Sequence, residues 1–385
     1  MLVSVQEIFF RHGLERAERA AVLPAGRGLG LLRCSAAKQL AKPQTGDPMN
    51  RRQLNASALL WADSALWGAA RAQAAPGAER GAEKGAEREA AAGERTRGWT
   101  RLPDMPLPLA KFGVAVLGGK IHVLGGYDTR RSVLVYDIAS QQWSHGPELP
   151  RGTDNVAAIA LADRLLAIGG EARLALQVLD AGRGQWSLAA ALPRVSFASA
   201  ATVLEGQVHV LGGWNYNNQN SASLDSHSVL DPSRMQWSSA APLPLARNAA
   251  AAVTLGGQLY LLGGRAPGIR AHDQHSLARM DVYSPAEDRW SSAPPLPRAR
   301  AGLAAVALDG RLYALGGEGP GGEVSAAMER YEPSRQTWTT LADMPYRSHG
   351  LGAVAAGGAL YVMGGFGQPS DAVGSESAAF YRYLP

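Results

Sequence analysis

Three arginines recur at nearly the same point of a repeated pattern in the C-terminal part of the chain. Arg247, Arg300 and Arg347 each stand just before a run of small residues. A guanidinium group binds a carboxylate or a phosphate through two parallel hydrogen bonds. The spacing therefore predicts a cationic arc that holds an acidic ligand. The alternative is that the arginines pair with a neighbouring repeat and only join the repeats together.

Two glutamates are candidates for proton transfer. Glu171 and Glu318 occupy the same position of two different copies, directly after a double glycine. A carboxylate beside an anion-binding arginine could transfer a proton to or from a bound acidic ligand. Glu171 could instead pair locally with Arg173 and have no chemical role.

Further polar and aromatic side chains complete the predicted ligand site. They stand at the start of a small-residue run or directly after a double glycine: Lys111, Asp154, Asn248, His349 and Trp214. Trp214 with Asn217 and Asn218 could stack on a sugar ring, although Asn is also an ordinary turn residue. His272, Asp273 and His275 are of the types that ligate zinc, but a solvated loop is the better interpretation. We expect no metal and no cofactor.

All of these residues are positioned by a pattern that occurs six times. A double glycine begins 26 residues after each of six tryptophans: Trp99, Trp143, Trp186, Trp237, Trp290 and Trp338. Identical offsets in six copies define a repeat protein from about residue 97 onward. A copy of about 48 residues has the size of a four-stranded propeller blade.

Each copy is predicted to form four strands. The small-residue run is the first strand, as in 112–117 and 301–308, and the segment ending at the double glycine is the second. Such Ala and Gly density is unusual for a strand and predicts strands that crowd around a central axis. His122 and His209 share a column of the second strand with tyrosines of other copies, so we predict that they pack rather than bind a ligand.

The double glycine, a tyrosine seven residues before the tryptophan, and the tryptophan itself resemble the Kelch repeat. Leu179 and Leu230 replace the tyrosine in two copies. The resemblance covers about residues 98–385 and implies an all-β, six-bladed Kelch β-propeller. Only one strand follows the last double glycine, so we expect the Trp99 segment to complete the sixth blade beside Tyr381 and Tyr383.

The first 97 residues lie outside the repeat. Residues 49–74 resemble a twin-arginine signal peptide, with paired arginines, an apolar stretch interrupted by Asp63, and a small-x-small cleavage site. This predicts a periplasmic or secreted protein. Residues 1–48 form an upstream extension that is not translated if synthesis starts at Met49. Residues 75–97 have a low-complexity composition that predicts a flexible, disordered linker.

The charge distribution argues against a nucleic-acid partner. Residues 1–96 carry 14 Lys and Arg against 10 Asp and Glu, whereas residues 97–385 carry 24 against 23. The basic excess is thus mostly outside the repeats. Cys34 is the only cysteine, which excludes an intrachain disulfide. No apolar run reaches the roughly 18 residues of a membrane span.

Length variation is confined to one end of the predicted ring. The distances from a double glycine to the next tryptophan are 18, 17, 25, 27 and 22 residues, while the other half of the repeat is constant. Variable loops on a constant scaffold usually carry binding. We therefore expect an exported binding module that recognises a protein or small carbohydrate ligand, acidic in character, at the propeller mouth. The alternative is a carbohydrate-active enzyme that resembles the sialic-acid mutarotase of the Kelch family.

Overall fold

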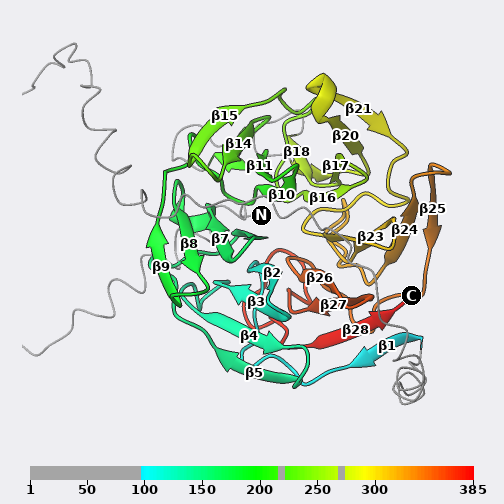
Figure 1. Ribbon diagram of the computed structural model, residues 1–385. Helices are drawn as coiled ribbons and strands as arrows, with labels where there is room; N and C mark the ends of the chain where they lie inside the picture. Colours follow the sequence, from blue (N-terminus) through cyan, green and yellow to red (C-terminus); the bar gives the residue numbers. More distant parts are fainter. Residues whose placement is uncertain (1–96, 216–221, 268–273) are drawn as a thin grey trace, which may run out of the picture. The chain divides into compact units, whose positions relative to one another are not determined.

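The computed structural model describes residues 97–215, 222–267 and 274–385 (Figure 1). The chain divides into two units, Met1–Arg80 and Gly81–Pro385, and every described residue belongs to the second. The predicted upstream extension, the signal peptide and almost all of the linker lie outside the described residues. So do Asn217, Asn218, His272 and Asp273.

Six four-stranded antiparallel sheets form the blades of a β-propeller (Figure 1). In blades 1 to 3 the strands follow the chain from the inner to the outer edge. Blade 1 consists of β2 (Gly113–Leu117), β3 (Lys120–Leu124), β4 (Val133–Asp137) and β5 (Gln142–His145). Blade 2 consists of β6 (Ala157–Leu161), β7 (Arg164–Ile168), β8 (Leu176–Asp180) and β9 (Gln185–Leu188), and blade 3 of β10 (Ala200–Leu204), β11 (Gln207–Leu211), β14 (His227–Asp231) and β15 (Gln236–Ser239). The all-β prediction is confirmed.

Blades 4 and 5 have the same order. Blade 4 consists of β16 (Ala251–Leu255), β17 (Gln258–Leu262), β20 (Met280–Ser284) and β21 (Arg289–Ala293). Blade 5 consists of β22 (Ala304–Leu308), β23 (Arg311–Leu315), β24 (Met328–Glu332) and β25 (Thr337–Thr340). Two short hairpins extend the loops of blades 3 and 4: β12 (Trp214–Asn215) with β13 (Ala222–Ser223), and β18 (Arg265–Pro267) with β19 (Gln274–Ser276). Among the described residues, no helix is long and apolar enough to cross a membrane.

Blade 6 closes the ring with strands from both ends of the described chain. Its order is β26 (Gly352–Ala356), β27 (Ala359–Met363), β28 (Phe380–Leu384) and β1 (Gly98–Arg101). Trp99 lies opposite Tyr383 in this pairing, and their rings are 4.9 Å apart. The predicted closure is therefore confirmed. The pairing with β1 gives β28 a second neighbouring strand, so that β28 is not an unpaired edge strand.

The inner strands approach one another so closely that small residues are required. A Cβ built on Gly113 of β2 would lie 2.7 Å from the Cβ of Ala158 in β6. A Cβ on Gly352 of β26 would lie 2.5 Å from a ring carbon of Phe112. Larger side chains would separate the blades, which explains the Ala and Gly density of the first strands.

The double glycines mark backbone contacts between blades. Gly169 and Gly170 both have positive φ. A Cβ on Gly170 would lie 2.0 Å from the carbonyl oxygen of Asp154 in the same blade, and a Cβ on Gly169 would lie 2.2 Å from that of Ser196 in the next blade. The N–H of Gly170 donates to the carbonyl of Ser196 in the next blade at 2.7 Å. Neither glycine position therefore leaves space for a side chain.

The tryptophans join neighbouring blades at the outer edge. Five indole N–H groups donate to a carbonyl in the connection that ends the preceding blade: Trp143 to Pro103 (3.0 Å), Trp186 to Pro147 (2.8 Å), Trp237 to Ala190 (3.4 Å), Trp290 to Ala241 (2.9 Å) and Trp338 to Pro294 (3.0 Å). Each indole also packs over the interface that it bridges. Their role is structural.

A buried histidine pair packs between blades 3 and 4. The Nδ1–H of His227 donates to the carbonyl of Ala241 at 3.1 Å, so its Nε2 accepts from Nδ1–H of His209 at 2.8 Å. The His227 ring lies 4.7 Å from that of Tyr283. Burial, and then the neighbouring His227, lower the pKa of His209 to about 4. His209 is thus a packing residue, held neutral.

Candidate functional site

A closed ring of six backbone hydrogen bonds surrounds the propeller axis, at the end where the variable loops lie. In each blade the residue entering the inner strand donates its N–H to the equivalent carbonyl of the preceding blade, over 2.7–3.2 Å: Lys111, Asn155, Ala198, Ala249, Gly302 and Gly350. All six have positive φ between 48° and 60°. Four of them are not glycine, so the backbone here is held in a conformation that L-residues rarely adopt. We call this end of the ring the mouth face.

Two of the three predicted arginines lie inside the blades. The side chains of Arg247 and Arg300 are 0% and 1% exposed, and they form ion pairs with Asp281 and Glu329, whose side chains are fully buried. Arg300 also donates to the carbonyl of Gly316 at 2.6 Å. These guanidinium groups are therefore already occupied.

Arg347 does not continue the series. Its side chain is exposed. The residue of blade 6 that is equivalent to Arg300 is Ser348. The carbonyl of Ser348 accepts the N–H of Gly317, just as the carbonyl of Arg300 accepts the N–H of Gly264. The structure therefore does not assemble the predicted arc of three arginines. The buried pair has the blade-stabilising role that the sequence left open.

A signal for this role is present in the sequence. Asp281 and Glu329 hold the second position of the third strand, 34 and 29 residues after their arginines. The copies without an arginine carry uncharged residues at that position: Leu134, Gln177, Ser228 and Tyr381. Comparing the two columns within one copy would have paired each arginine with its acid.

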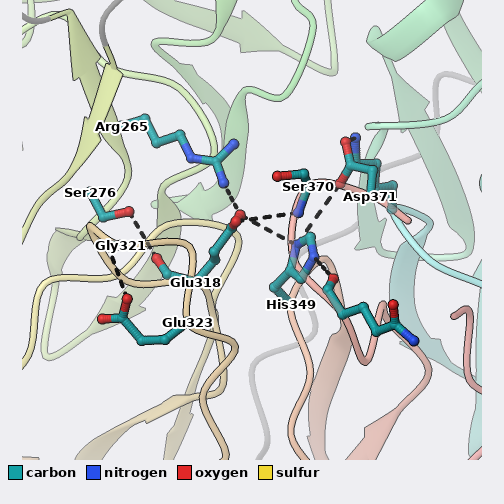
Figure 2. A network of polar contacts seen from close by, with 10 residues as sticks. Arg265, Ser276, Glu318, Gly321, Glu323, His349, Ser370 and Asp371 are labelled. Carbon is teal, nitrogen blue, oxygen red and sulfur yellow. Dashed lines mark hydrogen bonds and ion pairs between the residues drawn. The ribbon is translucent and has the colours of Figure 1, made fainter. Parts of the chain in front are cut away.

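Five ionisable side chains from blades 4, 5, 6 and 1 form a chain of contacts on the mouth face (Figure 2). Arg265 donates to Glu318, and Lys111 forms an ion pair with Asp371. Between these two pairs stands His349, whose Nδ1 is 4.0 Å from a carboxylate oxygen of Glu318 and 4.0 Å from one of Asp371. We call Arg265, Glu318, His349, Asp371 and Lys111 the mouth network.

The orientation of His349 leaves one ring nitrogen facing both carboxylates. Its Nε2–H donates to the carbonyl of Gln368 at 2.9 Å, so Nδ1 is the acceptor nitrogen of the neutral ring. Burial lowers the pKa of His349, against the opposing effects of the Gln368 carbonyl and the two carboxylates. Nδ1 of the neutral ring and the carboxylates of Glu318 and Asp371 are therefore all hydrogen-bond acceptors, and none of the three can donate to another.

A strained turn brings Asp371 into the network. Ser370 and Asp371 both have positive φ, 57° and 56°, and the Ser370 N–H reaches a carboxylate oxygen of Glu318 at 3.4 Å. Phe366 pairs with Glu376 and folds this loop back over blade 6. Asp371 was missed from the sequence, because Pro369-Ser370-Asp371 indicates a turn without showing where the carboxylate points.

Asp154 and Glu171 extend the mouth face over blade 2. Asp154 is 4% exposed, and burial raises its pKa while Lys111 opposes the rise. Glu171 is exposed and lies 3.8 Å from Arg130 of blade 1, which is its ion-pair partner in place of Arg173. Of the two predicted glutamates, only Glu318 is buried within the network.

Asn248 and Trp214 lie over blades 3 and 4. The amide of Asn248 donates to Ser223 at 2.9 Å, and its backbone pairs with that of Arg265. Trp214 is half-buried and pairs with Phe197 and with Ser223. Asn248 is thus linked to the mouth network through Arg265, whereas Trp214 belongs to the adjoining hairpin. Among the described residues, no group of three or more His, Cys, Asp or Glu could hold a metal ion.

Two family models match the propeller. The KLHDC2/KLHL20/DRC7 Kelch-repeats domain matches residues 198–378, and the Kelch motif matches residues 108–150. A solved structure titled "Structure of YjhT" is similar with a TM-score of 0.62 at 17% identity, covering 72% of this chain and 95% of that chain. That similarity concerns the fold.

Curated relatives share the same repeats. Kelch-like protein 35 of Mus musculus is 27% identical over 234 residues, which are 60% of this chain and 38% of that protein. Kelch-like protein 40 of Mus musculus is 28% identical over 225 residues, 57% of this chain and 28% of that protein. The matched region thus spans well under two thirds of either relative. The repeated pattern, the closed ring and the matching family models together show that residues 98–385 form a six-bladed β-propeller of Kelch repeats.

Proposed function

We propose that this protein is a binding module that recognises a segment of a partner protein on its mouth face. Kelch propellers typically serve as protein-interaction modules, and the family assignment supports this class of function. The observation that carries the proposal is the mouth network. Its five side chains come from four different blades, and the strained Ser370–Asp371 turn helps to hold them together. Backbone strain of this kind tends to accumulate at functional sites.

The chemistry of the network favours an uncharged hydrogen-bond donor. Arg265 and Lys111 contribute two positive charges, Glu318 and Asp371 two negative charges, and neutral His349 none. The net charge is therefore zero. The Nδ1 of His349 and the two carboxylates are all acceptors, so a hydroxyl or amide group of the partner would satisfy them. An acidic ligand would have to displace Glu318 or Asp371 from its cation.

A carbohydrate-active enzyme is a second candidate, favoured by one observation. Asp154 is a nearly buried carboxyl group with a raised pKa near Lys111. A carboxyl group of that kind suits general acid catalysis. Measuring anomer exchange of an acidic sugar with the parent chain and with Asp154→Asn and Glu318→Gln separates the candidates, because only an enzyme loses turnover in these variants.

Site-specific cross-linking tests the binding proposal. A photo-reactive residue replaces Tyr127, whose ring is 5.6 Å from that of Phe366 on the mouth face. The matched control replaces Arg335, an exposed residue in the β24–β25 turn at the opposite end of the ring. The proposal predicts that one identified protein is cross-linked from position 127 and not from position 335.

Binding of that protein is then measured with Asp371→Asn, His349→Gln and Arg335→Gln. Loss of a hydrogen bond to a charged group costs about 1.5–3 kcal/mol. Asp371→Asn should therefore weaken binding by about tenfold to a hundredfold. A hydrogen bond to the neutral His349 contributes about 0.5–1.5 kcal/mol, so His349→Gln should weaken binding by about twofold to tenfold, while Arg335→Gln leaves it unchanged. Equal binding by all three variants would place the partner elsewhere. A glycan as the sole cross-linked species would replace the protein partner with a carbohydrate.

A further inference from the structure

A cavity separates blades 6 and 1 at the seam where the ring closes. It has a volume of about 190 Å³ and is lined by Leu102, Tyr136, Gln141, Tyr361, Arg382 and Leu384, among others. Tyr136 belongs to β4 of blade 1, whereas Tyr361 and Arg382 belong to β27 and β28 of blade 6. None of the described lining residues belongs to the mouth network, and two of them, Gln141 and Gly357, lie in the β4–β5 and β26–β27 turns at the opposite end of the ring.

Arg382 is out of place in its column of the repeat. The third position of the third strand is valine in blades 1 to 4: Val135, Val178, Val229 and Val282. In blades 5 and 6 this position holds Arg330 and Arg382. A guanidinium group in a column that otherwise packs between blades needs a polar partner.

One donor group of Arg382 lacks a partner among the described residues. Its Nε is buried without a hydrogen bond, and none of the described residues that line the cavity is acidic. The guanidinium lies near enough to Tyr136 to oppose the rise in pKa that burial gives this phenol. The cation is thus placed at the cavity wall beside a hydroxyl group.

We propose that the seam cavity binds a small carboxylic acid with an apolar body about the size of one aromatic ring. Arg382 would hold the carboxylate through its unpaired Nε–H, with the phenol of Tyr136 as a further donor. Leu102, Ile138 and Leu384 supply apolar surface for the body of the ligand. A cavity of about 150 Å³ is known to admit benzene, so this one has room for a ring with a carboxylate.

The site would also couple ligand binding to closure of the ring. The ligand contacts β4 of blade 1 and β28 of blade 6, and the latter strand pairs directly with β1. A ligand that binds only the closed ring stabilises it by mass action. Benzoate should therefore raise the unfolding midpoint in a concentration-dependent way.

The test uses benzoate, neutral benzamide and inorganic phosphate as probes. Dissociation constants are measured by ligand-observed NMR with the full chain, Arg382→Gln and the matched variant Arg330→Gln. We expect benzoate to bind the full chain at least tenfold more tightly than benzamide or phosphate. Arg382→Gln should weaken benzoate binding about tenfold to a hundredfold, the range for a charge-assisted contact, and Arg330→Gln should leave it unchanged.

Direct observation of Arg382 protects the test against a variant that fails to fold. The Nε–Hε resonance of Arg382 in the parent chain should shift with saturation on addition of benzoate. The proposal is overturned if benzoate does not saturate this shift at millimolar concentrations, or if Arg382→Gln binds benzoate as the parent does. Equal affinity for phosphate and benzoate would overturn the requirement for a ring.

Discussion

Replacing Arg300 by methionine should destabilise the propeller strongly, because the substitution leaves Glu329 buried without its cation. The two side chains are 1% and 0% exposed, so water cannot solvate the remaining carboxylate. Burial already raises the pKa of Glu329 and lowers that of Arg300. Breaking a buried ion pair from one side typically costs about 3–5 kcal/mol. We expect Arg300→Met to lower the free energy of unfolding by this amount.

The double variant Arg300→Met/Glu329→Leu should recover most of the loss. The pair is imperfect, since Nε of Arg300 and one carboxylate oxygen of Glu329 are buried without hydrogen bonds. Replacing both partners of such a pair with apolar residues is often neutral or stabilising. The two single changes are therefore expected to couple by about 3 kcal/mol, the lower end of the cost of breaking the pair from one side.

Urea unfolding followed by tryptophan fluorescence measures this cycle. The matched control is Arg347→Met, which changes an exposed arginine and should shift stability by no more than about 0.5 kcal/mol. The reasoning would be refuted if Arg300→Met were as stable as Arg347→Met. It would also be refuted if the double variant were less stable than either single variant.

Three other predictions concern pH, closure and processing. His209 has a folded pKa of about 4, below its ordinary value near 6.5, so the unfolded chain binds the proton first. Stability should be complete above about pH 6.5 and fall by up to about 1.4 kcal/mol per pH unit toward pH 4; His209→Gln should flatten this dependence in urea titrations. Deleting residues 98–101 should cost at least about 3 kcal/mol of unfolding free energy, the loss for one packed tryptophan; an unchanged midpoint would argue against closure by β1. Residues 1–74 should be absent from the mature protein, and N-terminal peptides from 1–48 in its mass spectrum would disprove this.

Architecture could be predicted from the sequence because it depends on backbone contacts that repeat. Close approach at Gly170 and the indole contact of Trp290 each impose one residue type on one column, and crowding at Gly113 restricts its column to Gly and Ala. Six copies make such columns visible without a structure. The unpaired Trp99 segment then implied closure.

The candidate site was only partly predictable. Lys111, Glu318 and His349 were found because the loops of one end vary in length while the blades do not. Arg300 was expected on the mouth face but is buried in its blade. The position of a residue in the repeat does not show whether a long side chain points outward or into the blade. Asp371 depends on two consecutive residues with positive φ, a conformation that no residue type in that turn specifies.

Hydrogen exchange of the chain with its cross-linked partner tests the central claim most directly. Binding at the mouth network should slow amide exchange in residues 366–376 and around His349, where the strained loop carries Asp371. Exchange in the turns at the opposite end, such as the one containing Arg335, should be unchanged. Protection confined to those opposite turns, with residues 366–376 exchanging as in the free chain, would contradict the assignment of function to the mouth face.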